Sequence, residues 1–185
     1  MAKLEDVFLE NLKETLKGAP RYFLSGSVSA LFILLLADRG QLTAGAVEQE
    51  VKVPFFDLSA TQFGAAFIAL AIYILSGWMI ISIVKHVEQI KAKLIQLQAK
   101  DLLDAGLTYP SMLTTGKVIP VLATLLVAAL GTLALLAAFY ANQGFKGPFL
   151  AGLLCSHSYF IAAFFLWRSP LCEPSGISPS VKTAK

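Results

Sequence analysis

Residues 63–84, FGAAFIALAIYILSGWMIISIV, decide the fold, because this stretch contains no Asp, Glu, Lys or Arg. A helix needs about 20 consecutive apolar residues to cross the ~30 Å hydrocarbon core of a bilayer. The stretch reaches that length without an interruption by proline. It therefore predicts a transmembrane helix, and with it a membrane-embedded chain.

Three further apolar runs lie approximately at residues 22–37, 118–141 and 149–167, and none has a charged residue in its interior. The first of them is short, so Arg21 and Asp38 are expected to reach from its ends toward the membrane surfaces. The four runs predict an all-α integral membrane protein. Its fold is a four-transmembrane-helix bundle that occupies residues 21–168.

The distribution of charge predicts the orientation. Charged residues make up only 15% of the chain, against roughly 25% in soluble domains. Of the 15 Lys and Arg residues, 12 lie before the first run, between the second and third, or after the fourth. By the positive-inside rule both termini are cytoplasmic, in a bacterial inner membrane or an equivalent plasma membrane. Because topology explains the net charge of +3, membrane lipids are expected partners and nucleic acid is not.

Residues 1–20 are predicted to form an amphipathic cytoplasmic helix. Apolar residues recur in it at helical spacing, with charged residues between them: Leu4, Val7, Phe8, Leu12 and Leu16. Gly18, Ala19 and Pro20 are expected to end this helix before the membrane. Its apolar face suits docking to a membrane surface or a partner, and equally a partly buried arm.

The second span is expected to continue as a long cytoplasmic extension over residues 85–106. No Gly or Pro interrupts residues 78–105, and Gly106 would end the helix. Apolar residues repeat along it at heptad spacing and form a seam: Ile80, Ile83, Val87, Ile90, Leu94 and Leu97. Contact of this seam with the N-terminal helix of the same chain is slightly favoured over self-association of two chains.

The last segment, residues 169–185, contains three prolines and four serines and predicts a flexible cytoplasmic tail. Signatures of catalysis are missing, since the chain has no GxSxG, Walker, CxxC, HExxH or EF-hand pattern. Its acidic residues lie outside the predicted spans, whereas proton pumps and ion-coupled transporters place charged residues within the membrane. The sequence therefore predicts neither an enzyme nor an energy-coupled transporter.

Small and hydroxyl-bearing residues are predicted to pack the bundle. On a helical wheel of the fourth run, one face gathers the residues Gly152, Cys155, Ser156 and Tyr159. Gly131 in the third run, with Ser25 and Ser29 in the first, offers counterparts. Such faces let transmembrane helices approach closely, which makes these residues candidates for helix–helix contacts.

His157 lies on the opposite face of the same helix, among bulky apolar residues. An imidazole at membrane depth needs a hydrogen-bond partner. A carbonyl one turn back, a polar group of another chain, or an axially bound haem or pigment would each provide one. His86 is not a second axial ligand to the same haem, because the two imidazoles differ in depth by roughly 15 Å. The identity of a cofactor does not follow from the sequence.

These features favour a non-catalytic accessory or assembly subunit of a larger membrane complex, with a hetero-complex preferred over a homo-oligomer. Two alternatives remain open. One is a homo-oligomeric channel or membrane-disrupting effector, whose pore would be lined by hydroxyl groups because no charged ring is present. The other is an electron-transfer or light-harvesting subunit that binds a haem or pigment through His157.

Overall fold

The computed structural model describes residues 4–38, 50–54, 59–107, 109–114, 116, 118–143 and 146–169. These residues form five helices and two short strands, in the order α1 (Leu4–Asp38), β1 (Glu50–Lys52), β2 (Ser59–Thr61), α2 (Gln62–Gln96), α3 (Lys100–Leu107), α4 (Val118–Gln143) and α5 (Lys146–Arg168). The chain is therefore mostly helical over the residues that are described. Residues 170–185, which make up nearly all of the predicted tail, lie outside them.

In the part of the chain that the structure describes, three helical segments are long and apolar enough to cross a membrane: Asp6–Asp38, Gln62–Gln96 and Val118–Ala138. This finding confirms the coarser prediction, a helical protein with membrane-spanning segments. Large apolar side chains also cover the outside of these helices. Phe67 is 72% exposed and Leu126 is 70% exposed. A surface of this kind is suited to lipid contact.

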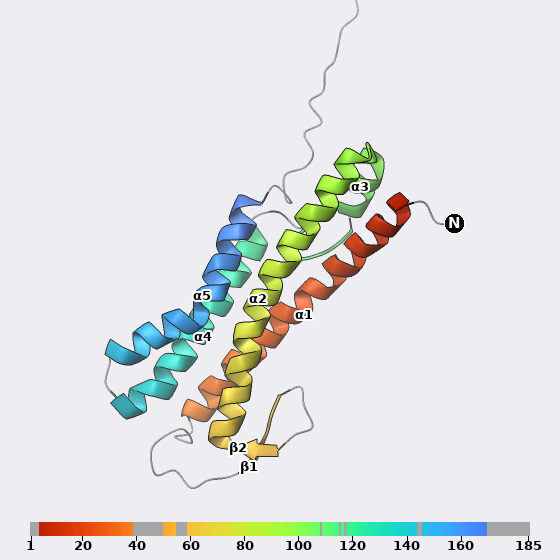
Figure 1. Cartoon of the computed structure of the whole chain (residues 1–185). Helices are drawn as coiled ribbons and strands as arrows, with labels where there is room; N and C mark the ends of the chain where they lie inside the picture. Colours follow the sequence, from red (N-terminus) through yellow and green to blue (C-terminus); the bar gives the residue numbers. More distant parts are fainter. Residues whose placement is uncertain are drawn as a thin grey trace, which may run out of the picture.

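Helices α1, α2, α4 and α5 form a bundle in which each helix packs on two neighbours (Figure 1). Helix α1 contacts α2 and α4, and α5 contacts the other sides of the same two helices. Small side chains lie where the helices cross, and Ala30, Ala128 and Ala162 are fully buried. The close approach that small residues allow is the main source of packing between helices in a membrane.

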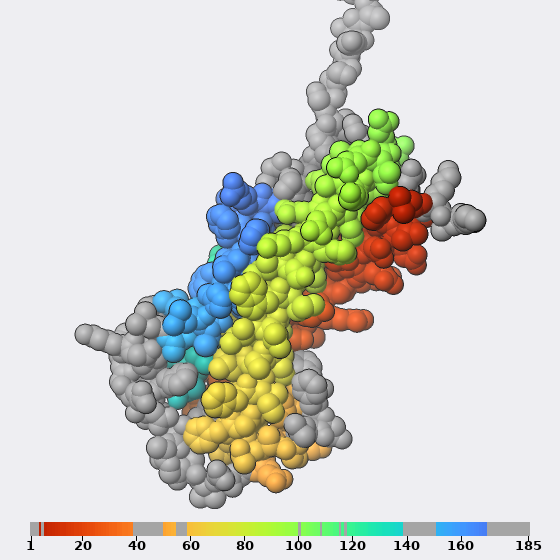
Figure 2. All heavy atoms as spheres, viewed as in Figure 1, coloured from red at the N-terminus to blue at the C-terminus, as the bar shows by residue number. Residues whose placement is uncertain are grey.

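A narrower part of the molecule, the extension, projects past the bundle at one end (Figure 2). It consists of residues 4–20 of α1, residues 85–96 of α2, and α3, which packs on both helices. Gly106 of α3 packs closely against α1, because a Cβ placed there would lie 2.6 Å from a methyl carbon of Leu12. At the other end of α2, strand β1 pairs antiparallel with β2. The last residue of β2, Thr61, caps α2, and its Oγ1 accepts a hydrogen bond from the N–H of Gly64 at 3.3 Å.

The expected helix break at residues 18–20 is wrong. Helix α1 continues from Leu4 to Asp38 with Pro20 inside it. A proline in a helix leaves the carbonyl four residues earlier without its N–H partner. Here that carbonyl belongs to Leu16, and it accepts a hydrogen bond of 3.0 Å from the hydroxyl of Ser111. A residue far along the chain thus removes the main cost of the proline.

The expected uninterrupted helix through residue 105 is also wrong. Helix α2 ends at Gln96, and Gln98 adopts a left-handed backbone with φ 58°. The N–H of Ala99 donates to the carbonyl of Leu94, and the N–H of Gln98 donates to that of Ile95, both at 3.0 Å. This pair of bonds is the Schellman pattern that ends a helix, with Gln98 in the position that glycine usually occupies. It allows α3 to fold back onto α1.

Candidate functional site

A cluster of buried hydroxyl groups joins three helices in the centre of the bundle. The hydroxyl of Tyr73 in α2 lies 3.0 Å from Oγ of Ser156 in α5 and 3.3 Å from the carbonyl oxygen of Val127 in α4. Oγ of Ser156 also lies 3.1 Å from Oγ1 of Thr132, which donates to the carbonyl of Ala128 at 2.9 Å. The cluster is thus built from side chains that are distant in sequence.

Each hydroxyl proton of the cluster can be donated to an acceptor within the cluster. Tyr73, Thr132 and Ser156 each carry one hydroxyl proton. The protons of Tyr73 and Thr132 can go to the two carbonyl groups, and Ser156 then donates to either of its hydroxyl neighbours. No proton of the three is left without an acceptor inside the cluster. This arrangement is suited to holding helices together rather than to binding a ligand.

Tyr159 adds a second bond between α5 and α2. Its hydroxyl donates to the carbonyl of Tyr73 at 2.9 Å, and the two rings lie 4.7 Å apart. Both hydroxyl groups point at glycines, because a Cβ on Gly26 would overlap the hydroxyl of Tyr159 and a Cβ on Gly131 would overlap that of Tyr73. Each tyrosine therefore requires a glycine at the facing position of the neighbouring helix.

The predicted packing residues have the following places. Gly152, Ser156 and Tyr159 are buried and Cys155 is half-buried. A Cβ on Gly152 would lie 3.3 Å from the carbonyl oxygen of Thr132. Ser25, which is half-buried, donates to the carbonyl of its own helix four residues earlier, and the buried Ser29 Oγ has no partner among the described residues. The structure thus brings Ser156, Tyr159 and Gly131 into one region and leaves Ser25 outside it.

Sequence reasoning missed Tyr73, Thr132 and Gly77. All three lie within apolar runs, where a single tyrosine, threonine or glycine has no distinguishing pattern. One available signal was the spacing of Tyr73 and Gly77, four residues apart and so on one face of α2. That face meets Tyr159 and Ser158 of α5.

Three of the six residues of the predicted seam lie inside the extension, whereas Ile80 and Ile83 lie in the bundle part of α2. Val87, Ile90 and Leu94 are buried in the same cluster as Leu12 and Leu16 of α1. Leu97, the last residue of the seam, is 38% exposed and lies after the end of α2. The N-terminal helix of the same chain therefore covers the buried part of the seam.

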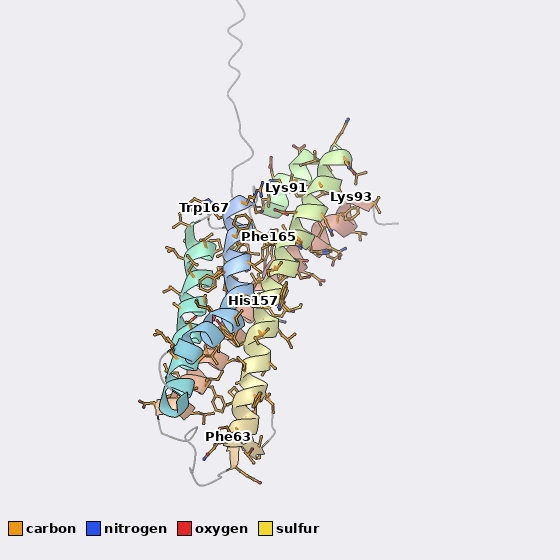
Figure 3. All side chains as sticks on the ribbon, turned by 60° about the vertical axis from the view of Figure 1, so that its left-hand side comes forward. Phe63, Lys91, Lys93, His157, Phe165 and Trp167 are labelled. Carbon is orange, nitrogen blue, oxygen red and sulfur yellow. The ribbon has the colours of Figure 1, made fainter. Side chains whose placement is uncertain are left out.

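His157 lies on the outer surface, in the middle of α5. Its Nδ1 contacts the carbonyl oxygen of Leu154, and its ring meets the ring of Trp78 edge-on, with centroids 5.6 Å apart. Figure 3 shows it about midway between Phe63 at one end of α2 and Trp167 at the end of α5. Because a carbonyl only accepts, Nδ1 carries the proton in the neutral imidazole. Nε2 is then an acceptor, and no described residue bonds to it.

The contact of His157 with the Leu154 carbonyl also explains why the hydroxyl of Ser158 has no hydrogen-bond partner among the described residues. A serine in a helix usually donates its hydroxyl to the carbonyl four residues earlier. For Ser158 that carbonyl belongs to Leu154, which already accepts the helical N–H of Ser158 and contacts Nδ1 of His157. The two lone pairs of the oxygen are therefore occupied. The buried hydroxyl of Ser158 has no hydrogen-bond partner among the described residues and lies instead against the backbone of Gly77.

Within the described residues no three His, Cys, Asp or Glu side chains gather in a way that could hold a metal ion. No family model, curated protein or solved structure matches the chain.

Proposed function

We propose that the chain is a non-catalytic accessory or assembly subunit of a larger membrane complex. Its partner is another membrane protein, which binds the outer face of α2 and α5 around His157 and Trp78. The observation that carries this proposal is the Nε2 of His157, to which no described residue bonds, on an exposed face at the centre of the bundle. An acceptor without a partner is unfavourable in hydrocarbon, and a donor from another chain removes that cost.

The topology that goes with this function has four spans and cytoplasmic termini, in a bacterial inner membrane or an equivalent plasma membrane. Helix α5 is the fourth span. Its 23 residues extend ~35 Å, and it packs along α4 and α2. Arg168 in its last turn and Lys85 of α2 lie at the end of the bundle that carries the extension, as the positive-inside rule requires of a cytoplasmic end.

The side chains around His157 support a protein partner. Trp78 is 45% exposed, Phe160 is 40% exposed and Phe164 is 57% exposed. Aromatic residues are enriched where protein surfaces meet, because a rigid ring buries a large area at little cost in side-chain entropy. The core of the bundle is less suited to binding a partner, since each hydroxyl proton of the cluster already has an acceptor within it.

A cofactor-binding subunit is the second candidate, and the same atom favours it. An imidazole whose Nδ1 is protonated and bonded to a carbonyl presents Nε2 as a metal ligand, the form that binds the iron of a haem. A channel receives less support. Of the hydroxyl groups that could line a pore, Ser25 is half-buried, and the other four are buried inside one bundle: Ser29, Thr124, Ser156 and Ser158.

Photo-crosslinking in native membranes tests the proposed interface. A photoreactive amino acid at Phe164, on the α5 face, is expected to crosslink to a second polypeptide. The matched control is Leu126 on α4, which is more exposed than Phe164 but lies on another face. His157→Leu is expected to reduce the crosslink from position 164.

The outcomes separate the candidates. Equal crosslinking from positions 164 and 126 would contradict a specific interface. Crosslinks only between copies of this chain would favour a homo-oligomer. A visible absorption band that co-purifies with the protein, and that His157→Leu removes, would favour the cofactor-binding subunit.

A further inference from the structure

A groove of about 330 Å³ lies between α1 and α2 at the base of the extension. Glu14, Gly18 and Tyr22 of α1 form one wall, and Ser82 and His86 of α2 form the other. The groove is separate from the face around His157. Seven residues line it, and among their side chains are a carboxylate and an imidazole.

The groove lies at the level of a membrane surface. Ser82 is near the end of the apolar run of α2, and Lys85 is the first charged residue beyond it. The ammonium group of Lys85 lies 5.0 Å from the ring centre of Phe165, which places the end of α5 at the same level. Trp167 follows there and is 63% exposed (Figure 3). Tryptophan and lysine mark the boundary between hydrocarbon and lipid headgroups.

The polarity of the groups that line the groove increases from its membrane end to its outer end. On α1, Tyr22, Gly18 and Glu14 follow one another at intervals of four residues, which corresponds to ~6 Å per step away from the hydrocarbon. On α2, which is antiparallel to α1, His86 lies one turn farther out than Ser82. The groove thus passes from an aromatic ring, through hydroxyl and imidazole groups, to a carboxylate. The backbone at Gly18 is open, since a Cβ placed there would meet no atom within 4 Å.

We propose that this groove binds the headgroup of a phospholipid that carries a primary ammonium, as phosphatidylethanolamine does. The imidazole N–H of His86 and the hydroxyl of Ser82 donate to the phosphate, and the carboxylate of Glu14 accepts from the ammonium. The ring of Tyr22 lies beside the glycerol. The order of groups in the lipid, from acyl chain to phosphate to ammonium, matches the order along the groove.

The charges around the groove favour a zwitterionic headgroup over an anionic one. Glu14 repels a headgroup that has only negative charge. The two neighbouring lysines face other partners, because Lys17 lies 5.6 Å from the ring centre of Tyr109 and Lys85 lies over Phe165. A choline headgroup fits less well, since its trimethylammonium has no N–H to donate to the carboxylate.

Native mass spectrometry of the full chain tests this site. The protein is released from micelles that contain equal amounts of phosphatidylethanolamine, phosphatidylcholine and phosphatidylglycerol with the same acyl chains. The unchanged protein is expected to retain phosphatidylethanolamine about tenfold over either competitor, as a charge-assisted hydrogen bond implies. Glu14→Gln is expected to abolish the preference over phosphatidylcholine. Glu10→Gln, an exposed carboxylate one turn away on α1 that does not line the groove, is the control and should leave it unchanged.

Gly18→Leu provides a second test that is independent of charge. A Cβ at this position meets no atom within 4 Å, and leucine has a higher helix propensity than glycine, so the substitution is expected to fill the groove while α1 stays folded. The variant is expected to lose the bound lipid.

Retention of the preference in Gly18→Leu, or equal retention of phosphatidylglycerol by the unchanged protein, would overturn the proposal. Equally tight binding of dissolved phosphoethanolamine would overturn the assignment to a lipid. Crosslinking at Phe164 does not depend on any of these results, so the two proposals fail separately.

Discussion

The hydroxyl of Ser111 donates a 3.0 Å hydrogen bond to the backbone carbonyl of Leu16, the group that Pro20 leaves without a helical partner. Ser111 is buried, and it lies between α3 and α4. Because the unpaired carbonyl is satisfied from outside the helix, α1 continues from the extension into the bundle as one helix. The extension and the bundle are thereby joined by two continuous helices, α1 and α2, rather than by a flexible connection.

Removing that hydroxyl should destabilise the fold only while the proline is present. Ser111→Ala leaves the Leu16 carbonyl buried and unpaired, which is expected to cost about 1–3 kcal/mol in the free energy of unfolding. In a Pro20→Ala background, residue 20 supplies the helical N–H, so the same substitution should cost clearly less. Denaturant unfolding in detergent measures the four variants of this cycle. An equal cost in both backgrounds would show that Ser111 acts through another contact, such as the N–H of Leu113 at 3.4 Å.

The stability of the turn at Gln98 should depend on the shape of the side chain at that position. A β-branched residue is disfavoured in a left-handed conformation, so Gln98→Val is expected to destabilise the protein by about 1–2 kcal/mol. Gln98→Gly should be neutral or stabilising. Gln96→Val, at the last residue of α2, is the control and should cost less than about 1 kcal/mol, which is the difference in helix propensity. Thermal unfolding ranks the three variants. If Gln98→Val cost no more than Gln96→Val, the turn would not depend on the conformation of Gln98.

The apolar runs were sufficient to predict membrane-spanning helices, because the length of an uncharged segment depends only on local sequence. Helical periodicity likewise separates Ser156 and Tyr159, which are buried, from His157, which is exposed. The path of the helices through the extension was not predictable in this way. Pro20 remains inside a helix because of a hydroxyl at position 111, and α2 ends at Gln96 without a glycine. The first feature depends on a tertiary contact, and the second on a left-handed backbone at a residue that is not glycine, so neither follows from the helix signals in the sequence.

The candidate site likewise contains residues whose role could not be predicted from local sequence. Tyr73 was missed because its importance comes from Ser156 and Val127, which only the folded bundle brings next to it. No local pattern distinguishes such a tyrosine from one that faces lipid. The groove beside His86 was missed for a similar reason. Its two walls come from helices whose relative register depends on how the seam packs against α1.

The pair of Gly26 and Tyr159 offers a test of the packing in the bundle. A methyl group at Gly26 would overlap the hydroxyl of Tyr159, so Gly26→Ala is expected to destabilise the bundle by about 1–3 kcal/mol. In a Tyr159→Phe background the nearest remaining atom is the ring carbon at 3.0 Å, and the cost should fall. Gly18→Ala is the control, because a Cβ there meets nothing within 4 Å and the change should be neutral or stabilising. Unfolding in detergent measures each variant. A cost for Gly26→Ala that does not change with Tyr159→Phe would place the close approach elsewhere.

The competition of His157 and Ser158 for one carbonyl leads to an unusual expectation for His157→Leu. Without the imidazole, one lone pair of the Leu154 carbonyl is free, and the hydroxyl of Ser158 can rotate to donate to it. Satisfying a buried hydroxyl is expected to raise the free energy of unfolding of the isolated protein by about 1 kcal/mol. The gain should shrink in a Ser158→Ala background, which has no hydroxyl to satisfy. Unfolding in detergent measures both, while crosslinking at Phe164 reports assembly. A variant that gains stability and loses the crosslink would show that His157 is kept for a contact with another chain, whereas an equal loss of stability in both backgrounds would assign it a role in the fold of its own helix.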